Sequence, residues 1–527
     1  VGYQNLDANT TGNNNTSMGA FTLGENTTGF QNVAVGNYAL DANTTAGNGT
    51  AIGYQALSAN TTGAHNTGIG VNALQVNTTG TQNVLDANTT ASYNTAVGYN
   101  SLSANTTGEP NEAFGVNSLV SNTTGTNNSA FGYNALTANT TASNNVAFGN
   151  HALAANTTGF NQTAVGSGAL ASNTTSNSNT AVGRDALNAN TTGSANTALG
   201  ANSLKANTTA DNNTAVGESA LLSNTTGSNN TAVGSQAGDA ITTGSSNTAI
   251  GDRALTTLTT GSSNTALGTQ ALNSVATAGE NTALGFQALM NHTATGAVAV
   301  GKDAMRANTT GGQNTAVGMD ALTSNTTGAA NVAIGYAAAM NQNANYSVII
   351  GDRANGSGSL SGDHNTFIGH YSGYTATTAV NNTAIGSNSM SAHTTGGNNV
   401  ALGYAALALN TTGSSNIAIG AYAYDANTTG AECVAIGRNA LGAASGVLQC
   451  VAIGHEALKV STASYNTAVG HQSLDANTTG AANVAVGDGT LGSNTTGNNN
   501  VAIGHFAINT ATTASQNVAV GTNALRQ

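Results

Sequence analysis

The sequence predicts an all-β protein, a parallel β-solenoid (β-roll) with a 17-residue repeat, in which each repeat forms one coil. A glycine recurs at this interval, as at Gly19, Gly36 and Gly53, within the repeated motif N-T-A-V-G-Y-x-A-L-x-A-N-T-T-G-x-x. Charged residues are 6% of the chain, against about 25% in ordinary domains. The period fits neither heptads nor a helical repeat, and Gly, Asn and Thr are poor helix formers. Dividing 527 residues by 17 gives about 31 coils, expected to form one continuous solenoid over 1–527.

Each coil is expected to hold two short strands and two turns. With the glycine as position 0, position −1 is apolar (Val35, Ile52), position −2 is Ala, and position −3 is Thr, Val or Ile. This alternation is typical of a strand with one buried face, here the face formed by positions −1 and −3. A second strand is expected around A-L-x-A-N-T-T, with Leu40 and Leu57 at +4. The glycines at 0 and +10 are expected at corners that need positive φ or close backbone approach.

Asparagine recurs in two columns, at −4 (Asn179, Asn196) and at +7 (Asn26, Asn43). Stacked amides can hydrogen-bond up and down a column, as in cross-β structures. The asparagines of the second column also spell N-x-T sequons, so glycan acceptors are the alternative. We favour ladders, because a glycan on every coil would crowd at a strand spacing of about 5 Å.

The core of such a coil is thin, because each repeat supplies only two or three sizeable apolar side chains. The Ala at −2 is expected to face away from this core, and a column of Ala along the solenoid lets another backbone come close. The sequence therefore predicts lateral association through the Ala face, most simply as a symmetric homo-oligomer.

Several repeats resemble those of trimeric autotransporter adhesin heads. The resemblance rests on N-V-A-I-G at Asn331–Gly335 and Asn500–Gly504, and on N-I-A-I-G at Asn416–Gly420. Each motif is followed by x-x-A, as in the x-x-A-L of the common repeat. The same style of repeat is similar to segments of bacteriophage tail-fibre-like proteins. The resemblance implies a left-handed β-roll, trimerised along its length, on a cell or virion surface. The 17-residue period is longer than the family's coil, with the extra residues around A-N-T-T-G.

We therefore expect the structural shaft of an extracellular or cell-surface fibre, adhesin-like, which binds further copies of itself as a homotrimer and an unknown surface receptor or glycan. The alternatives are a phage tail-fibre shaft and an ice-binding solenoid with a flat Thr face. No grouping of catalytic residues recurs, so neither an enzyme nor a cofactor is expected. A net charge of −12 argues against nucleic acid, and no apolar run approaches membrane length.

The repeat is irregular in four stretches, near 71–97, 238–304, 336–380 and 438–465. Breaks of this kind hold binding loops or reflect drift at exposed corners. Cys433, just before the last stretch, and Cys450, within it, stand one full repeat apart, so they are expected one above the other on adjacent coils. A disulfide and a pair of stacked free thiols both fit this placement. A metal site is disfavoured, because two Cys are too few.

The position after the glycine, +1, is the most variable and is expected to face solvent or a neighbouring chain. Tyrosines there form a possible contact face: Tyr54, Tyr99, Tyr133, Tyr336 and Tyr404. Oppositely charged neighbours at +1 and +2 suggest either cross-chain pairs that fix register or mutual neutralisation at the surface: Arg184–Asp185, Asp252–Arg253, Lys302–Asp303 and Asp352–Arg353. His455 and His471 stack on adjacent coils, with His505 further on, and solvated histidines are favoured over a shared metal.

Overall fold

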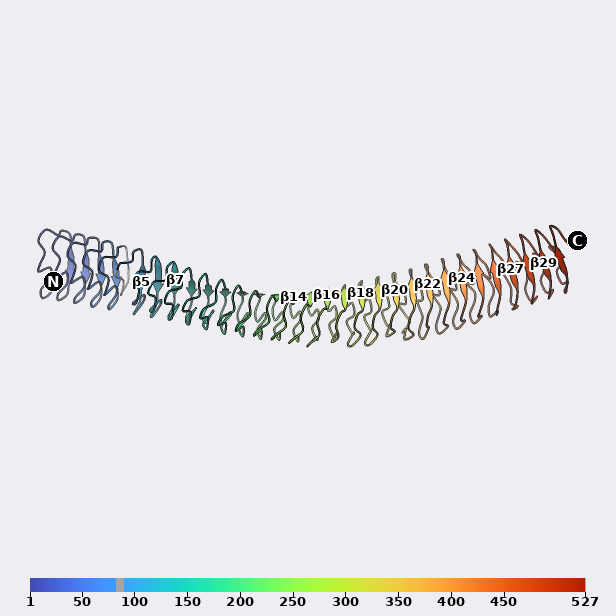
Figure 1. The fold of residues 1–527 in the computed structure, drawn as a ribbon, viewed down its shortest axis with the longest axis horizontal. Helices are drawn as coiled ribbons and strands as arrows, with labels where there is room; N and C mark the ends of the chain where they lie inside the picture. Colours follow the sequence, from blue (N-terminus) through green and yellow to red (C-terminus); the bar gives the residue numbers. More distant parts are fainter. Residues whose placement is uncertain (82–89, 527) are drawn as a thin grey trace. The chain divides into compact units, whose positions relative to one another are not determined.

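The computed structural model describes residues 1–81 and 90–526, and within them the chain forms 30 short strands and no helix. The chain divides into two compact units, Val1–Asn264 and Thr265–Gln527, which are described separately. In both, successive coils lie one on the next with their strands side by side (Figure 1). The predicted fold class, a parallel β-solenoid with a 17-residue repeat, is confirmed.

The first unit contains fourteen of the described strands: β1 (Thr16–Met18), β2 (Val33–Val35), β3 (Thr50–Ile52), β4 (Thr67–Ile69), β5 (Thr95–Val97), β6 (Asn111–Phe114), β7 (Asn128–Phe131), β8 (Val146–Phe148), β9 (Thr163–Val165), β10 (Thr180–Val182), β11 (Thr197–Leu199), β12 (Thr214–Val216), β13 (Thr231–Val233) and β14 (Thr248–Ile250).

The second unit contains sixteen of the described strands: β15 (Thr265–Leu267), β16 (Thr282–Leu284), β17 (Val298–Val300), β18 (Thr315–Val317), β19 (Val332–Ile334), β20 (Val348–Ile350), β21 (Thr366–Ile368), β22 (Thr383–Ile385), β23 (Val400–Leu402), β24 (Ile417–Ile419), β25 (Val434–Ile436), β26 (Val451–Ile453), β27 (Thr467–Val469), β28 (Val484–Val486), β29 (Val501–Ile503) and β30 (Val518–Val520).

Neighbouring strands are parallel and in register, so Thr180 lies opposite Thr197 and Ala181 opposite Ala198. The register is kept where the spacing changes. Val348 lies opposite Thr366 across a coil that is one residue longer than the repeat, and Val451 lies opposite Thr467 across a coil that is one residue shorter. The turns therefore absorb the length differences of the irregular stretches near 336–380 and 438–465. The stretch near 71–97 lies partly outside the described residues.

The alanine at −2 is the side chain that points into the core in most strands. The prediction that positions −1 and −3 form the buried face is therefore wrong. Ala198 is fully buried, whereas Leu199 beside it is 47% exposed. The reason is volume, because the interior is already filled by the Leu at +4 and by the two Asn columns. Gly68 shows how little room is left: a Cβ there would lie 3.3 Å from Leu57 Cγ and 3.0 Å from the Ala73 carbonyl oxygen. The predicted lateral contact through an outward Ala column is wrong for the same reason.

The second predicted strand is also wrong, because A-L-x-A-N-T-T forms turns. Non-glycine residues at +2, +4 and −5 adopt left-handed backbone, as Gln55 (φ 55°), Leu57 (φ 56°) and His65 (φ 60°) illustrate. Inter-coil hydrogen bonds continue through the turns. The Gln55 N–H donates to the Asn37 carbonyl of the preceding coil at 2.9 Å, and the Leu57 N–H donates to the Ala73 carbonyl of the next coil at 2.8 Å.

The corner glycine at position 0 is where the sequence prediction of positive φ is confirmed. Gly217 has a φ of +132°, and a Cβ on it would lie 2.4 Å from the carbonyl oxygen of Gly234 on the next coil. An L-residue is therefore opposed twice, by backbone conformation and by the close approach of the neighbouring coil. At +10 only the close approach applies: a Cβ on Gly108 would lie 2.2 Å from the Gly125 carbonyl oxygen.

Both asparagine columns are buried ladders, as predicted. At +7, the Asn207 side-chain amide donates to Asn190 Oδ1 at 2.8 Å and to the Ala210 carbonyl at 3.1 Å. At −4, the Asn213 backbone N–H donates to Asn196 Oδ1 at 2.9 Å, and its side-chain amide donates to the Gly227 carbonyl at 2.9 Å. These side chains are fully buried, so the ladder amides are not accessible to a glycan in the folded chain.

In the stretch near 238–304, where the +7 column loses its asparagine, apolar side chains or histidine take the buried place. Ile241 and Leu258 do so in the first unit, and Val275 and His292 in the second, all fully buried. Ile241, Leu258 and Val275 thus exchange ladder hydrogen bonds for apolar packing, whereas the His292 ring still meets the Asn308 amide at 3.0 Å. Whether any irregular stretch holds a binding loop stays a prediction, as does the handedness that the resemblance implies.

Candidate interaction surface

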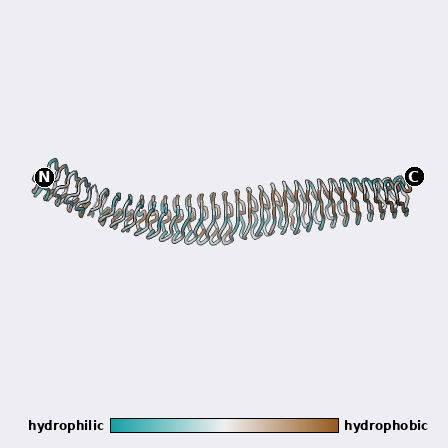
Figure 2. Tube along the Cα trace, turned by 45° about the horizontal axis from the view of Figure 1, so that its top comes forward, coloured by the Kyte–Doolittle hydropathy of each residue, from teal (hydrophilic) through white to brown (hydrophobic). Residues whose placement is uncertain are grey.

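The outward side chains of the strands, at −3 and −1, form the surface that we call the strand face. It exists because in most coils the inward position accepts little more than a methyl group, which leaves the larger side chains of the strand outside. Side chains of one kind recur once per coil, so hydrophobic and hydrophilic segments alternate within coils rather than separating into long stretches (Figure 2).

In the first unit the strand face from β9 to β14 combines a threonine column with an aliphatic column. Six successive strands carry Thr at −3 and Val, Leu or Ile at −1, ending with the pair Thr248 and Ile250. Parallel in-register pairing places like residues opposite one another, so Thr197 lies opposite Thr214 and Leu199 opposite Val216.

In the second unit the strand face from β23 to β26 is aliphatic in both columns. The outward pairs are Val400 and Leu402, Ile417 and Ile419, Val434 and Ile436, and Val451 and Ile453. Leu402 is 44% exposed and Ile417 is 38% exposed. This run of outward apolar side chains, exposed or half-buried, is a candidate interaction surface.

Aromatic side chains occupy the −1 column over three successive coils of the first unit. Phe114, Phe131 and Phe148 stack face to face, with ring centroids 4.6 Å and 4.3 Å apart. Phe148 is 47% exposed. The sequence reasoning missed this surface, although one signal pointed to it: Glu112 stands at −3 in β6, and an unpaired carboxylate is not tolerated in a core.

The five tyrosines predicted at the +1 corner are all exposed, as expected: Tyr54, Tyr99, Tyr133, Tyr336 and Tyr404. Two of them lie against a ring on the next coil. Tyr404 meets Tyr422 edge to face with centroids 5.2 Å apart, and Tyr133 meets His151 at 5.4 Å. Their role in binding another molecule stays a prediction.

Six of the eight charged residues predicted at +1 and +2 have a side-chain contact within the chain that the structure shows, mostly one coil away. Asp185 pairs with Lys205 at 3.2 Å. Arg253 donates to Gln236 at 3.3 Å. Asp352 meets His370 at 3.3 Å, and Arg353 donates to Tyr371 Oη at 2.7 Å.

Lys302 lies 3.7 Å from its neighbour Asp303, which Arg306 also approaches at 3.8 Å. The cations of these pairs are exposed, so each pair contributes little to stability. An inter-chain role for Arg184, Asp252 and the other charged residues at the corner stays a prediction.

The predicted histidine pair lies in one exposed column at +1. The rings of His455 and His471 stack with centroids 5.4 Å apart. His471 Nδ1 lies 2.8 Å from Asp488, and His505 Nε2 lies 3.3 Å from the other oxygen of that carboxylate. Among the residues that the structure describes, no group of three or more His, Cys, Asp or Glu side chains has the arrangement of a metal site.

Cys433 and Cys450 lie on adjacent coils in the −4 column, as predicted, and both are buried free thiols. The Cys450 N–H donates to Cys433 Sγ at 3.4 Å, in the place of the usual asparagine contact. The hydrogen bond from the Cys450 thiol lowers the pKa of Cys433. Tyr424, fully buried at a position where most coils have Leu, donates to the Val447 carbonyl at 3.1 Å and contacts Cys433 Sγ at 3.6 Å.

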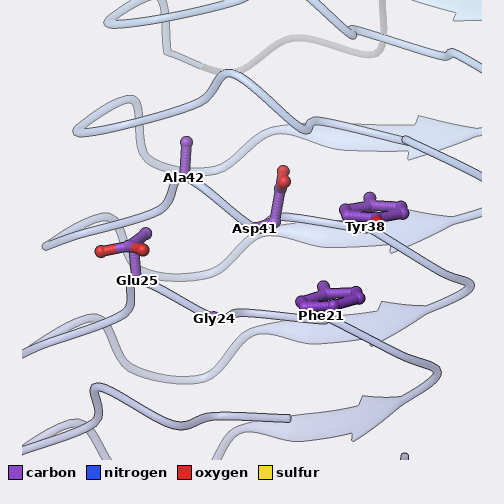
Figure 3. Close-up of a pocket in the computed structure, with 6 residues that line it drawn as sticks. All are labelled: Phe21, Gly24, Glu25, Tyr38, Asp41 and Ala42. Atoms are coloured by element: carbon purple, nitrogen blue, oxygen red, sulfur yellow. The ribbon is translucent and has the colours of Figure 1, made fainter. Parts of the chain in front are cut away.

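A shallow hollow lies at the corner of the second and third coils of the first unit (Figure 3). The rings of Phe21 and Tyr38 stack along one side with centroids 4.8 Å apart, beside Glu25 and Asp41. Burial raises the pKa of Asp41 to about 6. The hollow measures about 170 Å³, below the range of about 300–1,000 Å³ usual for small-molecule sites. We assign it no ligand.

No protein-family model matches this chain, and no curated protein matches its sequence. The described residues contain no helix long and apolar enough to cross a membrane. The strand face is therefore the feature on which a functional assignment has to rest.

Proposed function

We propose that this chain is the structural shaft of an extracellular or cell-surface fibre in which copies associate side by side through the strand face. One observation carries the proposal: aliphatic side chains stand outward on coil after coil, in register, as in β23–β26. Leaving such a surface in water forgoes about 25 cal/mol for each Å² of apolar area that could be buried.

A further copy of the same chain is the partner that fits this surface best. The outward side chains repeat at the strand spacing of about 4.8 Å, so a partner must offer apolar side chains at the same interval over many coils. Sheet faces that pack at about 10 Å interdigitate in this way. Identical faces also close around a rotation axis, as most homo-oligomers do. The resemblance to adhesin heads favours three copies.

The mechanical role is supported by the bonding between coils. Within each unit, consecutive coils are joined by strand hydrogen bonds, by turn hydrogen bonds such as that from Leu187 to the Ser203 carbonyl, and by the asparagine ladders. A structure that repeats these bonds on most of its coils resists local opening along its length. Such a shaft would hold the corner tyrosines at a distance from the surface that bears the fibre. There they would be accessible to a surface receptor or a glycan.

The test is the mass of the full-length protein in solution, measured by sedimentation equilibrium. We expect an oligomer that the double variant Ile417→Glu/Val434→Glu converts to monomer while the circular dichroism spectrum is retained. Glu112 shows that a glutamate at −3 is compatible with the fold. The matched control, Tyr422→Glu/Asn439→Glu, places the same charges on the same coils at the corner, away from the strand face, and should leave the oligomer intact. A monomeric wild-type protein, or equal behaviour of the two variants, would overturn the proposal.

A second candidate function, ice binding, is favoured by one observation. From β9 to β14 the strand face is regular and carries Thr beside Val, Leu or Ile on every coil, which gives an ordered array of hydroxyl and methyl groups. The Thr-Thr pair of the repeat does not supply such an array. It lies in a turn, and its first hydroxyl donates to the next coil, as Thr191 does to the Thr208 carbonyl at 3.0 Å. Thermal hysteresis that disappears in Thr197→Lys/Thr214→Lys would establish ice binding.

A cell-surface fibre and a phage tail fibre would use the same shaft, so their separation needs the native source. Antibodies against the corner tyrosines of the folded protein, used in immuno-electron microscopy, should label cell surfaces if the first assignment is right. Labelling confined to virion tails would replace it with the phage alternative.

A further inference from the structure

The −4 asparagine ladder is interrupted on two successive coils only at Cys433 and Cys450, within the part of the chain that the structure describes. Other substitutions in this column have asparagine on the coils above and below them: Gly49, Gln162, Ala297 and Ser347. The +7 column is lost on the same two coils, where Ala444 and Ser461 stand. Both ladders are therefore absent together here.

The bonds that replace the ladder are weak. Asn416, one coil earlier, donates from its amide to the Gly430 carbonyl at 2.8 Å. In the corresponding places Cys433 Sγ lies 3.5 Å from the Val447 carbonyl and Cys450 Sγ lies 3.5 Å from the Ala463 carbonyl. A thiol is a weak donor, and the contact from Cys450 N–H to Cys433 Sγ is correspondingly long at 3.4 Å. The junction of these coils is thus held less firmly by side chains than its neighbours.

The same two residues are placed where a covalent bond can form. Each stands directly before a strand, and β25 and β26 pair in register, with Val434 opposite Val451. The strand spacing of about 4.8 Å falls within the Cα separations of about 4.4–6.8 Å that disulfides span. Both thiols are fully buried, and the hydroxyl of the buried Tyr424 contacts Cys433 Sγ, so a bond formed between the two cysteines would be shielded from reductants.

We propose that Cys433 and Cys450 form a disulfide that joins two adjacent coils where both asparagine ladders are missing. The oxidant is a low-molecular-weight disulfide, RSSR, that reaches the thiols before these coils dock on one another. One cysteine thiolate attacks RSSR, forming a mixed disulfide and releasing RS⁻. The second thiolate attacks the protein sulfur of that mixed disulfide and releases the other RS⁻. The two cysteine protons leave with two molecules of RSH, so the cysteines are oxidised and RSSR is reduced.

Peptide mapping of the full chain tests the bond directly. The protein is unfolded and reduced, refolded with oxidised and reduced glutathione, blocked with iodoacetamide in denaturant, and digested with trypsin without reduction. Cleavage after Arg353, Arg438 and Lys459 separates the two cysteines into the peptides 354–438 and 439–459. We expect one linked species of these two peptides, split by reduction, from protein that migrates as a single chain on a non-reducing gel.

Three results would overturn the proposal: two carbamidomethylated cysteines, glutathione attached to either cysteine without a linked species, or a bond between chains. The effect on the fold is a second readout. The oxidised form should show a higher urea midpoint for the second unit than the reduced form, because the bond closes a loop between adjacent coils. The control Cys433→Asn/Cys450→Asn restores the column, and its midpoint should not respond to glutathione. An oxidised wild type without a raised midpoint counts against the bond as a stabilising link.

Discussion

The strand faces of β9–β14 and β23–β26 belong to coils built in the same way, and they differ in one outward position. Both regions have alanine inward and leucine at +4 in most coils, and asparagine stands at −4 in five of the six coils of the first region and in two of the four coils of the second. At −3 the first region has threonine throughout, whereas the second has valine or isoleucine. Threonine and valine have the same shape, so the two regions differ in polarity rather than in volume.

This difference teaches which positions the fold controls. The outward positions tolerate threonine, valine, isoleucine, glutamate and phenylalanine, because solvent accommodates all of them. The inward position is held to alanine in most coils, because the space beneath the strand is already occupied. Sequence variation at −3 and −1 therefore reports on what the surface meets, and the constancy at −2 reports on packing.

One coil of the second unit shows how the inward rule is broken. Phe367 takes the inward place of alanine in β21 and is fully buried. At +4 of the same coil, Gly373 stands where most coils have leucine, and a Cβ there would lie 2.4 Å from the Phe367 ring. The large side chain at −2 thus occupies the space that the missing leucine vacates, so the volume of the coil is conserved.

The largest expected effect comes from refilling that space. Gly373→Leu should destabilise the second unit by about 3 kcal/mol or more, because overpacking a close-packed core forces side chains off their rotamers. The double variant Phe367→Ala/Gly373→Leu recreates the usual coil and should recover most of the loss. Urea unfolding of the two single variants and the double variant measures the coupling. Additive losses would show that the two positions do not share one volume, and the inward rule would lose its basis.

The next effect concerns the buried histidines of the second unit, which replace asparagine at +7. Burial lowers the pKa of His292 to about 4, and burial likewise lowers the pKa of His393. The unfolded chain therefore binds protons first as the pH falls. The stability contributed by the neutral histidines is fully present above their unfolded-state pKa near 6.5. It is lost as the pH falls towards 4, by up to about 3 kcal/mol for His292.

The first unit should respond in the opposite sense at Asp41. Its folded pKa, raised by burial, means that the folded chain binds a proton more readily, so acidification from pH 6 to 4 stabilises that coil. Hydrogen exchange at pH 7 and pH 5, corrected for intrinsic rates, should show opening around His292 and tightening around Asp41. Asp425 and Asp475 in the second unit shift in the same direction as Asp41. The control His292→Asn, which restores the ladder residue, isolates the histidine effect by removing the local opening.

Counting positions from the glycine was enough to predict the coil, its first strand, both asparagine ladders and the stacking of Cys433 on Cys450. These features follow from periodicity, which a sequence displays directly. Periodicity does not determine which face of the strand is buried, because T-A-V places apolar groups on both faces. Hydrophobicity favours valine inside, and only the volume left beneath the strand decides for alanine.

The turns escaped prediction for a different reason. Leucine at +4 and polar residues at +2 adopt left-handed backbone, as Leu204 (φ 48°) and Asn202 (φ 58°) do, although leucine has no intrinsic preference for it. The neighbouring coils impose this conformation by hydrogen-bonding both peptide groups, as when the Leu204 N–H donates to the Ala220 carbonyl at 3.0 Å. In the sequence, only Glu112 indicated the strand face, the candidate site, because its carboxylate at −3 points to a solvent-exposed position.

The smallest effect on folding, and the closest test of the comparison, is exchange of the outward residues. Thr180, Thr197, Thr214 and Thr231 changed together to valine should alter unfolding free energy by less than about 0.5 kcal/mol per site, since outward substitutions leave the packed interior unchanged. The same variant should associate more strongly, because it gains a second aliphatic column. The reciprocal variant, with Val400, Val434 and Val451 changed to threonine, should fold equally well and associate less.

Thermal unfolding at low concentration and sedimentation at increasing concentration separate these two effects. The control pair is Ala198→Thr and Ala418→Thr, which place the same side chain inward on one coil of each region and should lower stability in both. If the outward exchanges cost as much as the inward ones, the assignment of faces is wrong. If they leave association unchanged, the polarity of the −3 column has no part in self-association, and the aliphatic −1 column common to both regions must carry it.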